Sequence, residues 1–123
     1  LGENWRNGRI SLPLEVYRND KWFGAPDGIE MFFGFHELIA HVAKTRPIKA
    51  GTVFGSGTVS NADISKGQAC ISELRAKEII ATGKPQTDFL QSGETVHMRV
   101  LDSQGKSIFG DIKQEAIMEN THV

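Results

Sequence analysis

The sequence has little of several residue types, and each shortage excludes a class of protein. Cys70 is the one cysteine among 123 residues, which excludes an internal disulfide. No apolar run approaches the roughly 20 residues of a membrane-spanning helix. Lys and Arg are scattered and the formal net charge is −1, so a basic surface for nucleic acid or an anionic membrane is excluded. We expect a cytoplasmic protein that binds neither nucleic acid nor membrane.

Alternating apolar and polar residues predict several strands. Strands are expected at residues 10–17 and 21–23, joined by a turn at Asn19-Asp20, and at 96–100 and 108–112, joined by a turn at 102–105. Shorter strands are expected at residues 68–75 and in the segment 51–60, which runs from a strand into a loop. Residues 74–84 have some helical character that ends at Gly83.

Residues 27–46 carry the clearest helical pattern. Asp27, with Glu30 three positions later, resembles a capping box, and Pro47 stops the helix. Apolar residues follow at helical spacing: Met31, Phe32, Phe35, Leu38, Ile39 and Val42. One main amphipathic helix among several strands predicts an α+β fold dominated by β structure. Its apolar bulk exceeds what a small core covers, which also suits a dimer contact.

The glycine-rich stretch "GTVFGSGTVSN" at residues 51–61 raises the question of a phosphate site. A P-loop would need a Lys directly after its last glycine, and a dinucleotide fingerprint would need G-x-G-x-x-G at the start of a helix. Neither spacing is present. Two interpretations remain open. Gly55 and Gly57 either let a carboxylate or carbonyl oxygen approach the hydroxyls of Ser56, Thr58 and Ser60, or they only turn the chain.

Other residues of catalytic type give weak signals. No Glu-x-Glu or Asp-x-Asp pair presents two carboxylates together. His36 and His41 are five positions apart, a spacing that does not place them on one helix face. His97 and His122 are expected to be bystanders, and Cys70 is expected to be a small buried thiol.

The order of three segments resembles the C-terminal part of the fumarylacetoacetate hydrolase family. These segments are the helix, then "KAGTVFGSGT", then "FLQSGETV", and the resemblance runs from about residue 5 to residue 117. The family pattern carries L-x-P-G-D before a [ST]-G-T sequence, and FL-x-x-G-D-x-V further on. This sequence departs from it at Ala50, Thr52 and Glu94, and keeps Ser56-Gly57-Thr58.

The resemblance implies a mixed β-roll or β-sandwich catalytic domain of a homodimeric enzyme. It implies Mg²⁺- or Ca²⁺-dependent hydrolytic cleavage of a C–C bond in a β-diketo acid of aromatic catabolism, with a His-activated water as nucleophile. Within the sequence, Ser56, Gly57 and Thr58 match the residues that contact the substrate carboxylate, and Glu73 matches the glutamate that orients the catalytic His and water. An alternative in the same family is a 2-oxo acid decarboxylase or tautomerase, or a hydratase.

The family's metal ligands, catalytic His and following Lys have no counterpart here, and the first residue is Leu rather than Met. We therefore expect residues 1–117 to be the C-terminal part of the catalytic domain of a longer enzyme, and 118–123 to be a polar tail. The upstream part would supply the metal ligands, and the chain alone would be inactive. A hypothesis of another class is that the segment is a non-catalytic dimerisation module.

Overall fold

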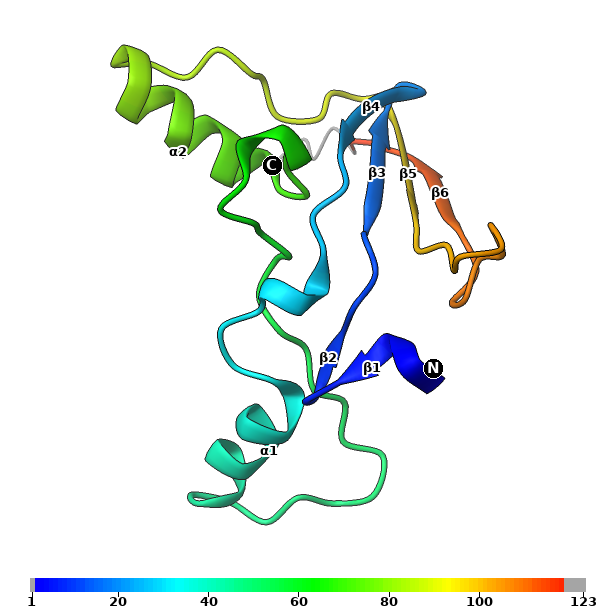
Figure 1. The fold of residues 1–123 in the computed structure, drawn as a ribbon. Helices are drawn as coiled ribbons and strands as arrows, with labels where there is room; N and C mark the ends of the chain where they lie inside the picture. The colour runs from blue at the N-terminus through cyan, green and yellow to red at the C-terminus, as the bar shows by residue number, and fades with distance from the viewer. Residues whose placement is uncertain (1, 119–123) are drawn as a thin grey trace.

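A computed structural model describes residues 2–118, so residues 119–123 of the predicted tail, His122 among them, lie outside the described residues. The strands are β1 Trp5–Arg6, β2 Arg9–Ile10, β3 Glu15–Arg18, β4 Lys21–Gly24, β5 Thr95–Arg99 and β6 Ile112–Glu115. The helices are α1 Phe35–Ala43 and α2 Ile71–Thr82, with short 3₁₀ turns at Gly2–Asn4, Gly28–Glu30 and Ile64–Lys66. The fold is α+β with more strands than helices, as predicted (Figure 1).

An antiparallel sheet in the order β4-β3-β5-β6 combines strands from the N-terminal and C-terminal parts of the chain (Figure 1). The predicted turn at Asn19-Asp20 is confirmed, because both residues have the positive φ (51° and 58°) of a tight hairpin turn. The predicted hairpin after Glu94 is also confirmed, with Thr95 opposite Glu115. Its return strand begins at Ile112 rather than at residue 108.

The predicted strand at residues 10–17 is interrupted, and only its ends are strands. Pro13, which has no N–H to donate, forms an isolated bridge with Asp27. The interruption separates β2, which pairs with β1 in a two-stranded sheet, from β3, which lies between β4 and β5. Pro13 therefore divides the chain between its two sheets.

The helix predicted over residues 27–46 is shorter than expected. Asp27 does accept a hydrogen bond from the Ile29 N–H at 2.8 Å, but it caps only a 3₁₀ turn. The true helix begins after Gly34, whose N–H donates to Glu37 Oε2 at 2.8 Å. Half of a capping box thus lies at 34 and 37 instead of 27 and 30.

The short strand predicted at residues 68–75 is wrong, because α2 begins at Ile71. The segment "SELRAKE" consists mostly of good helix formers, and this preference prevails where no strand is available for pairing. The predicted end at Gly83 is confirmed. Gly83 adopts a left-handed conformation with φ of 84°, and its N–H donates to the Ile79 carbonyl.

The core of the described residues is small. Among them, Val16 (5% exposed) and Pro26 are the fully covered apolar side chains. Phe32 and Ile80 are 85% and 86% exposed. The chain has an accessible surface of 8917 Å², whereas a compact monomer of this mass has roughly 6,600 Å². Much apolar surface therefore stays uncovered within this chain.

The edge of β4 contacts the segment before α2 through two glycines. A Cβ atom on Gly24 would lie 2.2 Å from the Gln68 carbonyl oxygen, and one on Gly67 would lie 2.6 Å from the Phe23 carbonyl oxygen. The Gln68 N–H donates to that same Phe23 carbonyl at 3.3 Å. Any side chain at Gly24 would force the two backbones apart.

The core predicts a stability difference between two Val→Ala variants. In the intact protein, Val16→Ala should lower the free energy of unfolding by about 2 kcal/mol, because it removes covered methyl groups and enlarges an adjoining cavity. Val53→Ala is the matched control, since Val53 is 91% exposed. Urea unfolding midpoints measure both, and equal midpoints would contradict the assignment of Val16 to the core.

Candidate functional site

The glycine-rich segment belongs to a long connection, residues 44–63, that contains no helix or strand (Figure 1). Gly51 turns the chain with φ of 86°, and Thr52 Oγ1 donates to the Lys49 carbonyl at 2.7 Å. From residue 53 to residue 60, no N–H donates to a backbone carbonyl within residues 2–118. The segment lacks the hydrogen-bond ladder of a strand, so the strand predicted within 51–60 is wrong.

Ser56, Gly57 and Thr58, the predicted substrate-binding residues, lie together in the exposed part of this loop. Neither Gly55 nor Gly57 has a positive φ, and a Cβ atom on either would meet no described atom within 4 Å. No turn or close packing within residues 2–118 therefore requires these glycines, and the backbone beside them is open. The Ser56 hydroxyl donates to the Gly57 carbonyl at 2.9 Å. The Thr58 hydroxyl, by contrast, takes part in no side-chain hydrogen bond among the described residues.

An open depression of about 210 Å³ lies beside the loop. Its lining combines the three polar loop residues with apolar side chains, namely Met31, Phe32, Phe33 and Leu38. The rings of Phe32 and Phe33 meet edge to face, with centroids 4.9 Å apart. A polar loop next to an aromatic wall suits a small molecule with one charged and one apolar end.

Glu73, the predicted catalytic residue, lies in the first turn of α2 rather than on a strand. Its Oε1 atom accepts from Ser60 Oγ at 2.6 Å and from Lys77 Nζ at 2.8 Å. The structure thus connects Glu73 to the glycine-rich loop through Ser60, and no hydrogen bond of the described residues joins it to Thr58.

The charge of Glu73 is held by this cluster. Partial burial acts to raise the pKa of Glu73, but hydrogen bonds from Lys77 and Ser60 outweigh it and hold the pKa below its ordinary value. Lys77 also donates to Gln68 Oε1 at 3.2 Å. An ionised carboxylate with these partners can orient a donor, and it is a weak proton acceptor.

Lys77 and Asn61 are part of this region but were not predicted. The spacing of four residues between Glu73 and Lys77 on a helix is a signal that could have revealed the ion pair. Asn61 carried no such signal, because asparagine is usually exposed. In the structure it is 5% exposed and directly follows the loop.

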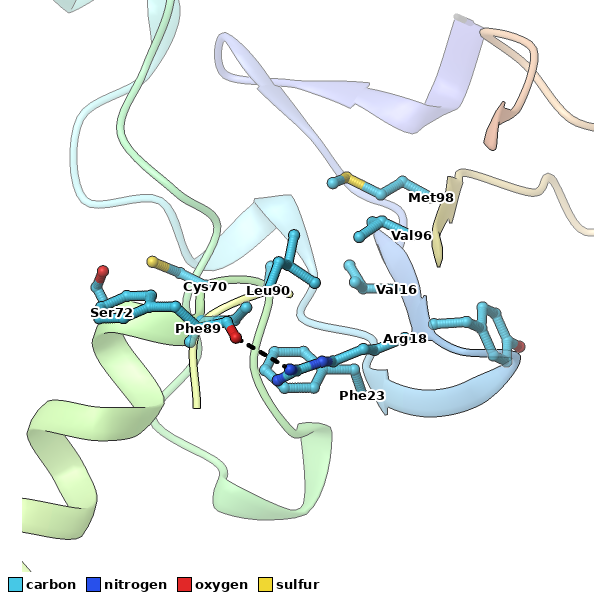
Figure 2. Close-up of a pocket in the computed structure, with 12 residues that line it drawn as sticks. Val16, Arg18, Phe23, Cys70, Ser72, Phe89, Leu90, Val96 and Met98 are labelled. Carbon is cyan, nitrogen blue, oxygen red and sulfur yellow. Dashed lines mark hydrogen bonds between the residues drawn. The ribbon is translucent and has the colours of Figure 1, made fainter. Parts of the chain in front are cut away.

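A second cavity, of about 200 Å³, lies under the sheet and beside the start of α2 (Figure 2). Most of its lining is apolar, with Val16, Val96 and Met98 from the sheet and Leu90 from the segment before β5. Cys70 lies at its edge and is half-buried, so the predicted buried thiol is only partly covered. This cavity is a gap in the packing between sheet and helix, and its walls offer few groups for a charged substrate.

The charged group at this cavity, Arg18, is fully engaged. Its guanidinium donates to both carboxylate oxygens of Glu94, at 2.9 and 2.5 Å, and to the Asp88 carbonyl. It also donates to the Phe89 carbonyl, as Figure 2 shows. Glu94 also accepts from the Asn19 side chain and the Gln91 N–H, each at 2.8 Å. Chiefly through the Arg18 hydrogen bonds, the pKa of Glu94 falls from its ordinary value to about 2. Glu94 therefore acts as a structural anion.

The histidines do not form a site among the described residues. His36 and His41 are both exposed on α1. His97, expected to be a bystander, has a partner: its Nε2 atom lies 2.8 Å from Asp111 Oδ2, and its ring stacks on Tyr17. The pKa of Asp111 is lowered, chiefly by its hydrogen bond with His97. This pair connects β5 to the residues before β6.

Within residues 2–118 no three His, Cys, Asp or Glu side chains come together in a group that could hold a metal ion. The described residues therefore do not fit a metal, and the groups that they offer for chemistry are hydroxyls, amides and a carboxylate. No helix among residues 2–118 has the length and apolar character needed to cross a membrane.

Comparison with known protein families identifies a match over almost all of the chain. The family model described as fumarylacetoacetate (FAA) hydrolase C-terminal matches residues 2–117 of the chain. The match includes the glycine-rich loop, Glu73 and both hairpins of the larger sheet. A comparison with curated proteins found no match.

The Arg18–Glu94 pair predicts a pH-dependent difference in stability. Because the pKa of Glu94 is lower in the folded protein than its ordinary 4.5, its contribution is present above about pH 4.5 and is lost as the pH falls toward 2. Glu94→Gln should therefore destabilise the intact protein at pH 6 more than at pH 3.

Urea unfolding midpoints of wild type and variant at the two pH values measure this effect. Glu115→Gln, at an exposed position of β6, is the matched control and should show no such difference. An equal loss for Glu94→Gln at pH 3 and pH 6 would refute the ion-pair explanation.

Proposed function

Because the chain belongs to the fumarylacetoacetate hydrolase family, we propose that its protein is an enzyme that hydrolyses a C–C bond of a β-diketo acid. The segment described here contributes the loop that binds the substrate carboxylate. The observation that carries this proposal is the Ser56-Gly57-Thr58 loop, with its open backbone and the unused Thr58 hydroxyl. The family makes a hydrolase or lyase reaction the expected class.

The loop offers the donors that a carboxylate needs. N–H groups from residue 53 to residue 60 donate to no backbone carbonyl within residues 2–118, so they are available to an anion. The Thr58 hydroxyl adds a further donor, and hydrogen bonds to a charged group are stronger than those between neutral groups. The Phe32 and Phe33 rings offer apolar surface beside the loop to the apolar part of the substrate.

Glu73 is assigned a positioning role. Its Oε1 atom already accepts from Ser60 and Lys77, which leaves Oε2 to accept from a catalytic His or a water molecule. Such a carboxylate favours the His tautomer and orientation needed to take a proton from water. The family generally depends on a divalent metal, Mg²⁺ or Ca²⁺ in our proposal. Its ligands would lie outside the described residues.

A decarboxylase or tautomerase of 2-oxo acids, or a hydratase, is the alternative reaction within the family. A 2-oxo acid has the same carboxylate as a β-diketo acid, so the loop would serve either substrate. The reaction depends on groups beyond this loop. Product identity therefore separates these candidates.

A second candidate function, dimerisation, is favoured by the exposed aromatic pair. Phe32 is 85% and Phe33 54% exposed, and α1 contains no buried residue. Paired aromatic side chains are typical anchors of protein interfaces. We propose that this face contacts a second copy in a homodimer, and that upstream residues of the same protein cover other apolar surface.

The carboxylate role predicts a selective kinetic loss. In the intact protein with added Mg²⁺, Thr58→Val should lower kcat/KM for fumarylacetoacetate or an acylpyruvate roughly 10- to 100-fold, since a hydrogen bond to a charged group contributes about 1.5–3 kcal/mol. Thr45→Val is the matched control at an exposed position after α1. Unchanged kinetics of Thr58→Val would reject the role, and conversion of oxaloacetate to pyruvate without diketone cleavage would favour the decarboxylase.

The interface proposal predicts a change of assembly. Replacement of both phenylalanines, Phe32→Ser with Phe33→Ser, should convert the intact protein from dimer to monomer, because the anchors of the contact are removed. Sedimentation velocity measures this change, and Phe109→Ser, at a similarly exposed position (56%), is the control. A double variant that remains dimeric would place the interface elsewhere.

A further inference from the structure

We propose that Asn61 is a positioning residue that holds the glycine-rich loop in its place and thereby orients Thr58. The inference rests on the proposed function of the loop as the substrate-carboxylate site. Asn61 follows Thr58 by three residues, so a fixed Asn61 confines the Thr58 Cα atom to within roughly 10 Å along the chain.

The contacts of Asn61 are those of a backbone clamp. Its Oδ1 atom accepts from the Asp27 N–H at 2.7 Å, and its Nδ2 atom donates to the Asp27 carbonyl at 2.9 Å. The second Nδ2 proton goes to the Ser60 carbonyl, also at 2.9 Å. The amide therefore pairs with both backbone groups of one residue, as a neighbouring strand would, while only 5% of Asn61 is exposed.

The partner, Asp27, lies in a rigid part of the fold. Pro26 before it is fully buried, and its carbonyl accepts from the Leu14 N–H at 2.9 Å. Gly28 after it lies so close to Ile10 that a Cβ atom would be 2.5 Å from the Ile10 carbonyl oxygen. Asp27 is thus fixed against the segment between the two sheets. Its hydrogen bonds with the Asn61 side chain therefore fix Asn61 as well.

The loop itself has few other restraints. Its first residues are held by the turn at Gly51 and the Thr52–Lys49 hydrogen bond. After that, no backbone hydrogen bond restrains residues 53–60 within the described chain. Two further hydrogen bonds flank Asn61: the Ser60 hydroxyl donates to Glu73, and the Ala62 N–H donates to Glu30 Oε2 at 3.1 Å. Of these anchors, Asn61 is the one that is buried and bonded at three points.

A purely structural role makes a different prediction from a positioning role. If Asn61 only stabilised the fold, its replacement would lower stability and leave KM unchanged in the molecules that remain folded. If Asn61 positions Thr58, its replacement should raise KM in folded protein. The effect should also be absent once the Thr58 hydroxyl has been removed.

A double-mutant cycle on the intact protein tests this. With the substrate that it turns over, Asn61→Ala should raise KM roughly 10-fold, and the Thr58→Val/Asn61→Ala double variant should be no worse than Thr58→Val alone. Asn61→Ser, a smaller change, serves if the alanine variant does not fold. Val16→Ala controls for lost stability and should leave KM unchanged, because Val16 lies at the other cavity.

A second measurement does not depend on activity. Chymotrypsin should cleave after Phe54, within the loop, several-fold faster in Asn61→Ala than in Val16→Ala, because the loop loses its anchor. Equal cleavage rates would overturn the proposal, and so would strictly additive effects in the cycle when Thr58→Val alone raises KM. If Thr58→Val alone had no effect while Asn61→Ala raised both KM and the cleavage rate, the carboxylate role of Thr58 would fail and the positioning of the loop by Asn61 would still be supported.

Discussion

The ion pair between Arg18 and Glu94 is the interaction on which most of the arrangement depends. It joins the end of β3 to the residue before β5, 76 positions apart in sequence. The same guanidinium holds the Asp88 and Phe89 carbonyls, and the Phe89 ring lies under the guanidinium of Arg75 on α2, 4.4 Å from centroid to carbon. The position of α2, and with it Glu73, therefore follows from a contact made at the sheet. Because the core is small, such polar contacts contribute more to fixing the relative positions of helix and sheet.

The candidate site is divided between a fixed part and an open part. Glu73 is held by Ser60 and Lys77, and Asn61 is held by Asp27. Thr58 lies before these anchors with a free hydroxyl. Such a division suits a binding loop, because rigid neighbours lower the entropy cost of binding while the contacting residues stay accessible. The family relationship indicates a hydrolase or lyase class of chemistry, and in the proposed function the loop would recognise the substrate carboxylate.

Local patterns predicted the parts of the fold that depend on nearby residues. The turn at Asn19-Asp20, the hairpin after Glu94 and the stop at Gly83 depend on positive φ or on strict alternation, and both are visible in sequence. The strand predicted around Glu73 was wrong because helix propensity prevailed without a strand partner. The burial of Asn61 could not be predicted, since it depends on Asp27, 34 residues earlier. Ser56, Gly57 and Thr58 could be proposed from the motif, but the hydrogen bond from Ser60 to Glu73 could not.

The Gly24–Gln68 junction and the glycine-rich loop differ in how much change they tolerate during evolution. The backbones at Gly24 and Gln68 meet so closely that this junction tolerates no added atom. Between Thr52 and Ser60, by contrast, the chain meets few neighbours, and loop length has only a weak effect on stability. Insertions and deletions can accumulate there while the sheet stays intact. Under the proposed function, a change in the length of this segment would alter the substrate site while the sheet stays intact.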